Sequence, residues 1–276
     1  MAWLTVGKEN SADVQIYYED RGSGRPVVLI HGWPLSGASW ERQVAALLGA
    51  GYRVITYDRR GFGSSSKPAD GYDYNTLATD LAMLIDALHL QDAAIAGFSM
   101  GGGEVARYMG KFNSGAVTKC AFIASIAPAL RKDGANPEGV DPKVFEGVKQ
   151  QIEKDRYAFL ESFLKEFFNH GFFSGSKSSD AVIHASFAVA AASSYGAMLD
   201  CVDAWLEDFR DDVKSITAPT LVIHGTDDKI VPFEASGERV AKMVPGAQLV
   251  TLEGAPHGCL WTHATEINTA LLNFLK

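Results

Sequence analysis

Short apolar runs alternate with helix-patterned segments along the first 123 residues of the chain. The apolar runs are typical of buried strands and lie at residues 27–30, 53–57, 93–98 and 117–123. A half-buried strand pattern precedes them at residues 14–18. Apolar residues recur at helical spacing between the runs, over residues 39–50, 74–88 and 100–112. The pattern predicts an α/β fold with a mostly parallel central sheet and helices on both faces.

This alternation stops at Pro128 and resumes after Asp212. The intervening segment holds only helical patterns, which cover residues 142–168 and 178–202. The strand and helix signals then return at residues 220–224, 248–252 and 265–275. We therefore expect a core made of residues 1–127 and 213–276, with a helical cap of residues 128–212 inserted before the last strands. A cap in that position is well placed to cover the strand ends.

Composition and charge narrow the function classes. The chain has 276 residues, 47% of them hydrophobic and 21% charged, which is ordinary for a globular protein with a sizeable core. The formal net charge of −8 repels phosphate backbones, so no nucleic acid partner is expected. No stretch approaches the roughly 18 uninterrupted apolar residues of a membrane span, so no membrane is expected either. Three cysteines and an N-terminus without a signal-peptide pattern favour a cytoplasmic location.

A serine stands at one of the predicted strand-to-helix junctions. Residues 97–101 read Gly-Phe-Ser-Met-Gly, which matches the G-x-S-x-G pattern of a nucleophilic serine. Glycines two residues before and after Ser99 remove Cβ atoms that would collide across a tight turn. Such a turn would raise the Ser99 hydroxyl above the sheet and leave the Met100 N–H at a helix N-terminus. The pattern therefore predicts that Ser99 is a catalytic nucleophile.

A nucleophilic serine needs a histidine base and a carboxylate that orients it, in the chain order serine, acid, histidine. His257 lies in a loop between the last predicted strand and the last predicted helix, so we assign it as the base. The loop after the strand at 220–224 holds two adjacent aspartates, whose side chains cannot both point into one site. We assign Asp228 as the orienting acid and Asp227 to the turn.

The loop after the first apolar run is expected to supply a second donor for the oxyanion. It reads His-Gly-Trp-Pro-Leu at residues 31–35. Gly32 allows a close backbone approach, and Trp33 offers an N–H that would converge with that of Met100. Pro34 has no N–H to donate, and it biases the backbone of Trp33 toward an extended conformation. Trp33 and Met100 therefore form the predicted oxyanion hole.

Four motifs together resemble one family. They are the segments at residues 31–35, 58–63, 97–103 and 255–258. The chain resembles the α/β-hydrolase superfamily over its full length, and within it the cofactor-free bacterial haloperoxidases, or perhydrolases, which include aryl esterases, amidases and γ-lactamases. The resemblance implies an α/β-hydrolase fold, a triad of Ser99, Asp228 and His257, and backbone donors from Trp33 and Met100.

The same resemblance implies two small-molecule reactants. A small-molecule ester or carboxylic acid acylates the serine, and hydrogen peroxide then attacks the acyl-enzyme in place of water. The resulting peracid oxidises halide in solution. His31 and His224 occupy positions that are structural in the family, and no haem or metal-ligand pattern is evident, so neither a cofactor nor a metal is expected. The sequence leaves the oligomeric state open, a homo-oligomer included.

Apolar side chains near the predicted strand ends and on the cap are candidates for the substrate pocket. These candidates are Pro34, Ile126, Leu130, Phe159, Phe163, Ile230 and Phe233. Phe167 and Phe168 continue the phenylalanine spacing along the cap helix. A phenylalanine-rich lid that faces Trp33 would favour aryl or small apolar esters. The alternative is that these rings only pack the cap onto the core.

Several reactions fit the same triad. The leading hypothesis is a serine esterase with perhydrolase activity. A γ-lactamase or amidase, or a carbon–carbon bond hydrolase, would use the same residues. A haloalkane dehalogenase or an epoxide hydrolase would need an aspartate in place of Ser99 and is disfavoured. A non-catalytic ligand receptor on the same fold is the alternative from a different class, and an intact triad argues against it.

Overall fold

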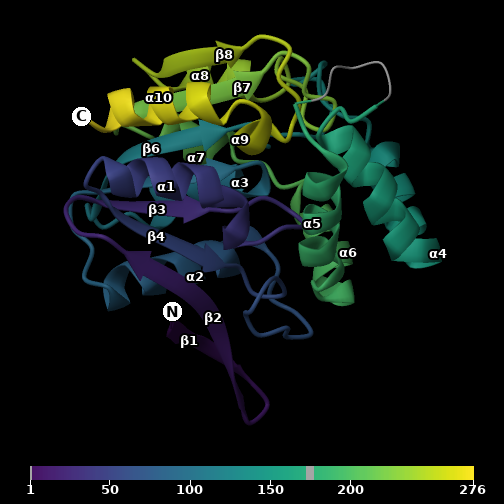
Figure 1. Cartoon of the computed structure of the whole chain (residues 1–276), viewed down its shortest axis with the longest axis horizontal. Coiled ribbons are helices and arrows are strands. Elements are labelled where there is room, and N and C mark those ends of the chain that lie inside the picture. Colours follow the sequence, from purple (N-terminus) through teal and green to yellow (C-terminus); the bar gives the residue numbers. More distant parts are fainter. Residues whose placement is uncertain (1, 172–176) are drawn as a thin grey trace.

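The computed structural model describes residues 2–171 and 177–276. One eight-stranded sheet runs through the molecule in the spatial order β1-β2-β4-β3-β5-β6-β7-β8 (Figure 1). The strands are β1 (Ala2–Glu9), β2 (Ala12–Arg21), β3 (Pro26–Ile30), β4 (Arg53–Asp58), β5 (Ala93–Phe98), β6 (Val117–Ile123), β7 (Thr220–Gly225) and β8 (Gln248–Leu252). Strands β3 to β8 are parallel, whereas β2 pairs antiparallel with both β1 and β4. The predicted α/β fold with a mostly parallel sheet is confirmed.

Helices cover both faces of this sheet. The helices of the described residues are α1 (Glu41–Gly49), α2 (Tyr74–Ala87), α3 (Met100–Arg107), α4 (Pro142–Phe167), α5 (Asp180–Ala191), α6 (Tyr195–Ala204), α7 (Arg210–Lys214), α8 (Gly237–Met243), α9 (Cys259–Thr262) and α10 (Ala264–Leu275), with the short helices η1 (Gly37–Trp40) and η2 (Tyr108–Phe112). The chain crosses the sheet in one direction through α1, and in the opposite direction through α2 and α3. Right-handed crossovers in opposite directions place their helices on opposite faces. Accordingly, α1 packs beside α10, and α2 packs beside α3.

Helices α4, α5 and α6 stand to one side of the sheet and lie within the predicted cap segment (Figure 1). Helix α4 packs against both α5 and α6, and it is interrupted at Asp155, where φ is −163° and ψ is 93°. The helix predicted over 178–202 is divided into α5 and α6, and the Ser194 hydroxyl caps the second of them. Helix α7 crosses the predicted cap boundary at residue 212 and packs against α3 of the core.

The elements that the sequence analysis missed are β1 and the short helices α7, α8 and α9. Strand β1 is an edge strand whose residues are mostly exposed or half-buried, so it carries no apolar run.

Among the described residues, no single helix has the length and apolar composition of a membrane span. Helices α5 and α6 meet that criterion only as a pair bent by 97°.

A buried ionic cluster ties β3, β4 and α3 together beneath the site. The Arg59 guanidinium donates to the Glu104 carboxylate through Nε at 2.5 Å and to the His31 carbonyl at 2.7 Å. Glu104 also accepts from the Tyr57 hydroxyl at 2.5 Å. The His31 ring accepts the Arg59 backbone N–H at Nε2 (2.9 Å), so its Nδ1 donates to the Gly32 carbonyl (2.9 Å). This pairing sets the tautomer of His31 and the path of the loop that follows β3.

We predict that the His31→Gln variant loses less unfolding free energy than the wild type as the pH falls from 7 to 5. Burial, together with the positive charge of Arg59, lowers the pKa of His31 well below its ordinary value of 6.5. Below about pH 6.5 the unfolded chain therefore binds a proton that the folded chain excludes, so folding free energy is lost as the pH falls.

This group should contribute up to about 1.4 kcal/mol of lost unfolding free energy per pH unit in the wild type, and nothing in the variant. Urea unfolding at pH 7, 6 and 5 measures both slopes. Equal slopes in the two proteins would contradict the assignment.

Candidate active site

Ser99 occupies a strained turn between β5 and α3. Its φ of 54° and ψ of −119° lie outside the conformations that residues with side chains usually adopt. A Cβ on Gly97 would lie 2.3 Å from the Gly101 carbonyl oxygen, and a Cβ on Gly101 would lie 2.4 Å from that of Ile30. Only glycine fits at both positions, which explains the spacing of the motif. The turn is packed against the end of β3.

Three side chains from separate elements form one hydrogen-bond chain. His257 Nε2 lies 2.9 Å from Ser99 Oγ, and His257 Nδ1 lies 2.7 Å from Asp228 Oδ2. All three residues are buried. Because Asp228 Oδ2 accepts from Nδ1, the other ring nitrogen is free to accept the serine proton. The His257 ring is held in place by the rings of Phe98 and Phe167, whose centroids lie 5.1 Å and 4.9 Å away.

The Asp228 carboxylate is anchored by the backbone of its own loop. Its Oδ1 accepts the N–H groups of Ile230 (3.0 Å) and Val231 (2.8 Å). Burial by itself raises the pKa of this carboxyl, but the charge of His257 and hydrogen bonds from His224 and His257 outweigh it and hold the pKa below its ordinary value. Asp228 therefore stays ionised beside the imidazole.

The adjacent aspartate points elsewhere. Asp227 is exposed, and its Oδ2 accepts from the Asn169 side-chain amide at 2.6 Å. Its backbone N–H donates to the Ala255 carbonyl at 3.2 Å. Of the two neighbouring carboxylates, the one at Asp228 is therefore the one that reaches the imidazole.

Two backbone N–H groups beside Ser99 lack an acceptor. In the part of the chain that the structure describes, neither Trp33 nor Met100 donates its backbone N–H to another group. Met100 is the first residue of α3, where the helix dipole adds partial positive charge. The loop that carries Trp33 abuts the serine, since a Cβ on Gly32 would lie 3.0 Å from the Ser99 Cβ. Two unused donors at this position are suited to an oxyanion.

A cavity of about 410 Å³ adjoins the serine and the histidine. The core lines it with Trp33, Ser99, Ile126, Lys229, Ile230, Val231 and His257. The cap segment lines it with Leu130, Val140, Val144, Phe145, Gly147, Val148, Gln151, Phe159, Ser162, Phe163, Glu166 and Trp205. The Trp33 ring lies edge-on to the rings of Phe163 (5.2 Å) and Trp205 (4.9 Å). Core and cap thus meet across an aromatic, mostly apolar chamber.

Five of the predicted pocket residues line this cavity: Ile126, Leu130, Phe159, Phe163 and Ile230. Pro34 and Phe233 are not among its lining residues. Pro34 is buried in the loop after Trp33, and the Phe233 ring packs against His224 at 5.6 Å instead. Sequence analysis missed Trp205 and the residues at 140–151, because nothing in their local pattern shows that the cap folds back over the serine.

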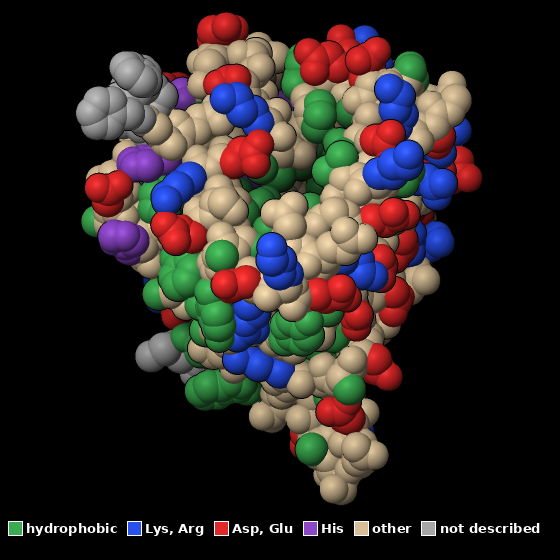
Figure 2. Space-filling model, turned by 90° about the vertical axis from the view of Figure 1, so that its right-hand side faces the viewer, with side chains coloured by type: hydrophobic (Ala, Val, Ile, Leu, Met, Phe, Trp, Pro, Cys, Tyr) green, Lys and Arg blue, Asp and Glu red, His purple; other side chains and the backbone are tan. Residues whose placement is uncertain are grey.

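The cavity reaches solvent between α4 and the loop after β7. Val144, Gln151, Glu166 and Lys229 line it and are all exposed, Val144 to 53%. Figure 2 views the molecule from the side of these cap helices, and acidic and basic side chains are interspersed over that face. A surface of mixed sign attracts no single class of ion.

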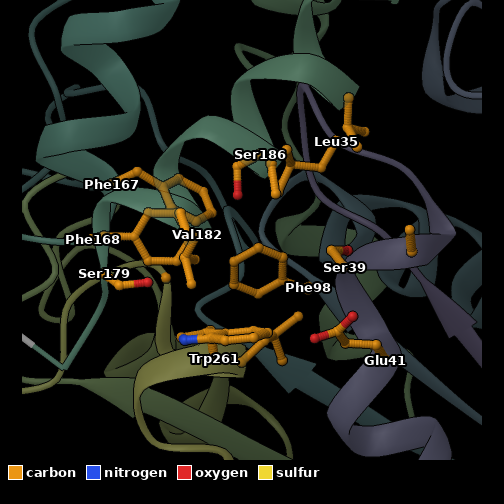
Figure 3. A pocket seen from close by; sticks show the side chains of 16 residues that line it. Leu35, Ser39, Glu41, Phe98, Phe167, Phe168, Ser179, Val182, Ser186 and Trp261 are labelled. Carbon is orange, nitrogen blue, oxygen red and sulfur yellow. The ribbon is translucent and has the colours of Figure 1, made fainter.

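A second cavity of about 410 Å³ is lined by Phe98 and Phe167, the two rings that pack against His257 (Figure 3). Helix α5 lines it with Val182 and Ser186, and Trp261 of α9 faces them across the space. The triad side chains do not line it. Within residues 2–171 and 177–276, no group of three His, Cys, Asp or Glu side chains is placed to hold a metal ion.

Comparison with known proteins agrees with this geometry. The family model for the α/β hydrolase fold matches residues 25–264. The chain is 53% identical over 276 residues to a Synechocystis sp. protein provisionally named a non-heme chloroperoxidase, with 100% of both chains covered. It is 36% identical over 267 residues to a bifunctional esterase/perhydrolase from Acinetobacter calcoaceticus, covering 95% of this chain and 96% of the other.

Among solved structures, a bromoperoxidase from Bacillus anthracis matches with a TM-score of 0.94 and 46% identity, over 99% of each chain. The resemblance stated from the motifs is therefore confirmed. The chain belongs to the α/β hydrolase family and, within it, to the family of the non-heme chloroperoxidases.

Proposed function

We propose that this chain is a serine esterase for small or aryl carboxylic esters that also forms peracids from hydrogen peroxide. The observation that carries the proposal is the hydrogen-bond chain from Ser99 through His257 to Asp228 at the wall of a mostly apolar cavity. The similarity of this chain to proteins named as a non-heme chloroperoxidase and as a bifunctional esterase/perhydrolase supports the proposal.

Acylation uses only groups of the chain. Ser99 Oγ attacks the ester carbonyl while His257 Nε2 takes the hydroxyl proton. The carbonyl oxygen becomes an oxyanion that accepts from the backbone N–H groups of Trp33 and Met100. The intermediate then collapses, the C–O bond of the ester breaks, and His257 returns the proton to the leaving alcohol. The acyl group remains on Ser99.

The acyl-enzyme is then opened by one of two competing nucleophiles. Water, deprotonated by His257, gives the carboxylic acid and free Ser99. Hydrogen peroxide follows the same path and gives the peracid and free Ser99, with the same proton passing through His257. The released peracid oxidises halide in solution. The chloroperoxidase activity is therefore a consequence of the esterase reaction carried out with peroxide.

The cavity indicates the substrate class. The rings of Trp33, Phe159, Phe163 and Trp205 converge within a volume of about 410 Å³. Such a chamber holds a short acyl chain or an aryl group and buries little polar surface. The polar and charged lining residues Gln151, Glu166 and Lys229 are exposed, so the apolar part of a substrate would lie deeper.

One prediction tests the nucleophile. Ser99→Ala should lower kcat for p-nitrophenyl acetate hydrolysis by roughly 10⁴- to 10⁶-fold, because no other group can form the acyl-enzyme. KM should change little. Release of p-nitrophenol measures it, and the same assay on the wild type separates an esterase from a non-catalytic receptor. A variant that kept a tenth of wild-type activity would exclude Ser99 as nucleophile.

Two neighbouring aspartates give a matched control. Asp228→Asn should cost about 10⁴-fold in kcat, because an amide at this position favours the wrong tautomer of His257. Asp227→Asn should leave kcat within about twofold, since that side chain contacts Asn169 and not the triad. Equal losses in the two variants would refute the assignment of the acid.

Another prediction concerns metal and cofactor. Prolonged dialysis against EDTA should leave esterase and peracid-forming activity intact, because every proposed step uses backbone donors and the triad. A serine-directed phosphonate should inactivate the same sample and label Ser99, as peptide mass spectrometry would show. Activity lost on dialysis and restored by a divalent metal would overturn the proposed route.

A last prediction for this function concerns the choice between water and peroxide. Water and hydrogen peroxide each lose one proton to His257 and keep one O–H, but the O–H that peroxide keeps is on its distal oxygen. An acceptor placed to reach that more distant O–H would favour peroxide. The Trp33 carbonyl accepts no hydrogen bond from the described residues, and its direction depends on the backbone at Trp33 and Pro34. One such hydrogen bond is worth on the order of 1 kcal/mol, or roughly a fivefold preference.

Pro34→Leu should therefore lower the ratio of peracetic acid formation to ester hydrolysis by roughly fivefold while hydrolysis itself persists. Both products are measured from the same ester at matched peroxide concentration. A ratio unchanged from the wild type would remove Pro34 from the mechanism.

A further inference from the structure

His224 is a buried polar residue beside the triad. It takes no part in the acylation step or in the opening of the acyl-enzyme. It lies near the end of β7 and is fully buried. Its Nε2 lies 2.9 Å from the Val231 carbonyl oxygen and 3.3 Å from Asp228 Oδ2. Both of these neighbours are acceptors, so Nε2 carries the proton and donates toward them.

The rest of the ring is held by packing. Its Nδ1 is buried and has no hydrogen-bond partner among the described residues. A Cβ on Gly237, at the start of α8, would lie 2.6 Å from this atom, so the α8 backbone closes that side of the ring. The Phe233 ring packs nearby, with its centroid 5.6 Å away. The His224 ring therefore has one position and one tautomer.

A closed set of hydrogen bonds results. Val231 donates its N–H to Asp228 Oδ1 (2.8 Å) and accepts the His224 Nε2–H at its carbonyl (2.9 Å). The same Nε2–H lies within reach of Asp228 Oδ2, the oxygen that accepts from His257. His224 thus connects the end of β7 to both the loop and the carboxylate that orient the base.

We propose that His224 is a positioning residue of the triad, acting through Asp228, and this inference rests on the proposed function. Its Nε2–H directs Asp228 Oδ2 toward His257 Nδ1 and holds the loop of Asp228 against β7. His257 gains its positive charge only as the serine proton moves, so a well-oriented Asp228 stabilises the transition state more than the bound substrate. Loss of the donor should therefore appear in kcat and not in KM.

A matched pair of variants isolates the donor. His224→Gln keeps an N–H donor on an unbranched side chain, and His224→Met keeps the same length without the donor. Methionine should lower kcat for p-nitrophenyl acetate roughly tenfold to a hundredfold with KM within about twofold, since a hydrogen bond to a charged group is lost. Glutamine should stay within about threefold of wild type. Phe233→Leu alters the packing of the ring but leaves its N–H, so kcat should hold even where thermal stability falls.

A second readout is independent of turnover. The proton between His257 Nδ1 and Asp228 Oδ2 should give a far-downfield proton NMR resonance, as short charge-assisted hydrogen bonds do. This signal should shift or broaden in the methionine variant and persist in the glutamine and Phe233→Leu variants. Circular dichroism and thermal unfolding confirm that each protein is folded.

The outcomes separate the two proposals. A wild type without esterase activity would defeat the proposed function, whereas the resonance would still report whether His224 orients the pair. Folded methionine and glutamine variants with equal kcat and an unchanged resonance would overturn the positioning role and leave the esterase intact. A kcat that falls equally in the Phe233→Leu control would reduce His224 to a packing residue.

Discussion

The turn at Ser99 is the constraint on which the rest of the site depends. A residue with a side chain holds φ at 54° there, a strained conformation that persists only where the surrounding packing over-determines it. That packing is the close approach of Gly97 to Gly101 and of Gly101 to Ile30 of β3. Because the start of α3 lies directly against β3, the loop after β3 reaches the serine. The free N–H groups of two distant segments then lie on the same side of the sheet.

Buried charge carries this arrangement into the core. Arg59, Glu104 and Tyr57 join β4 to α3, and Arg59 also binds both the ring and the carbonyl of His31. A buried ion pair adds little net stability when it is complete, but removing one partner leaves an uncompensated charge. Its effect here is positional. It fixes the ends of β3 and β4 in position relative to the first turns of α3. These positions in turn fix the path of the loop that carries Trp33.

The core and the cap contribute different parts of the site. The core supplies every group that handles protons or charge, each from the carboxyl end of a parallel strand or the loop after it. The cap supplies most of the chamber wall through α4 and Trp205. Changes in the cap can therefore alter which esters fit without touching the hydrogen-bond chain.

The amino-acid sequence by itself determined the parallel core, the turn at Ser99 and the chain order of the serine, the acid and the histidine. Fully buried strands and tight glycine turns leave their signal within a few neighbouring residues, so they are legible without the fold. The edge strand β1, the place of Trp205 in the chamber and the exclusion of Pro34 and Phe233 from it were decided by the tertiary structure. The same holds for the contact between His224 and Asp228. Each of these depends on which segments and side chains come into contact in the folded chain. The spacing of neighbouring residues in the sequence does not predict such contacts.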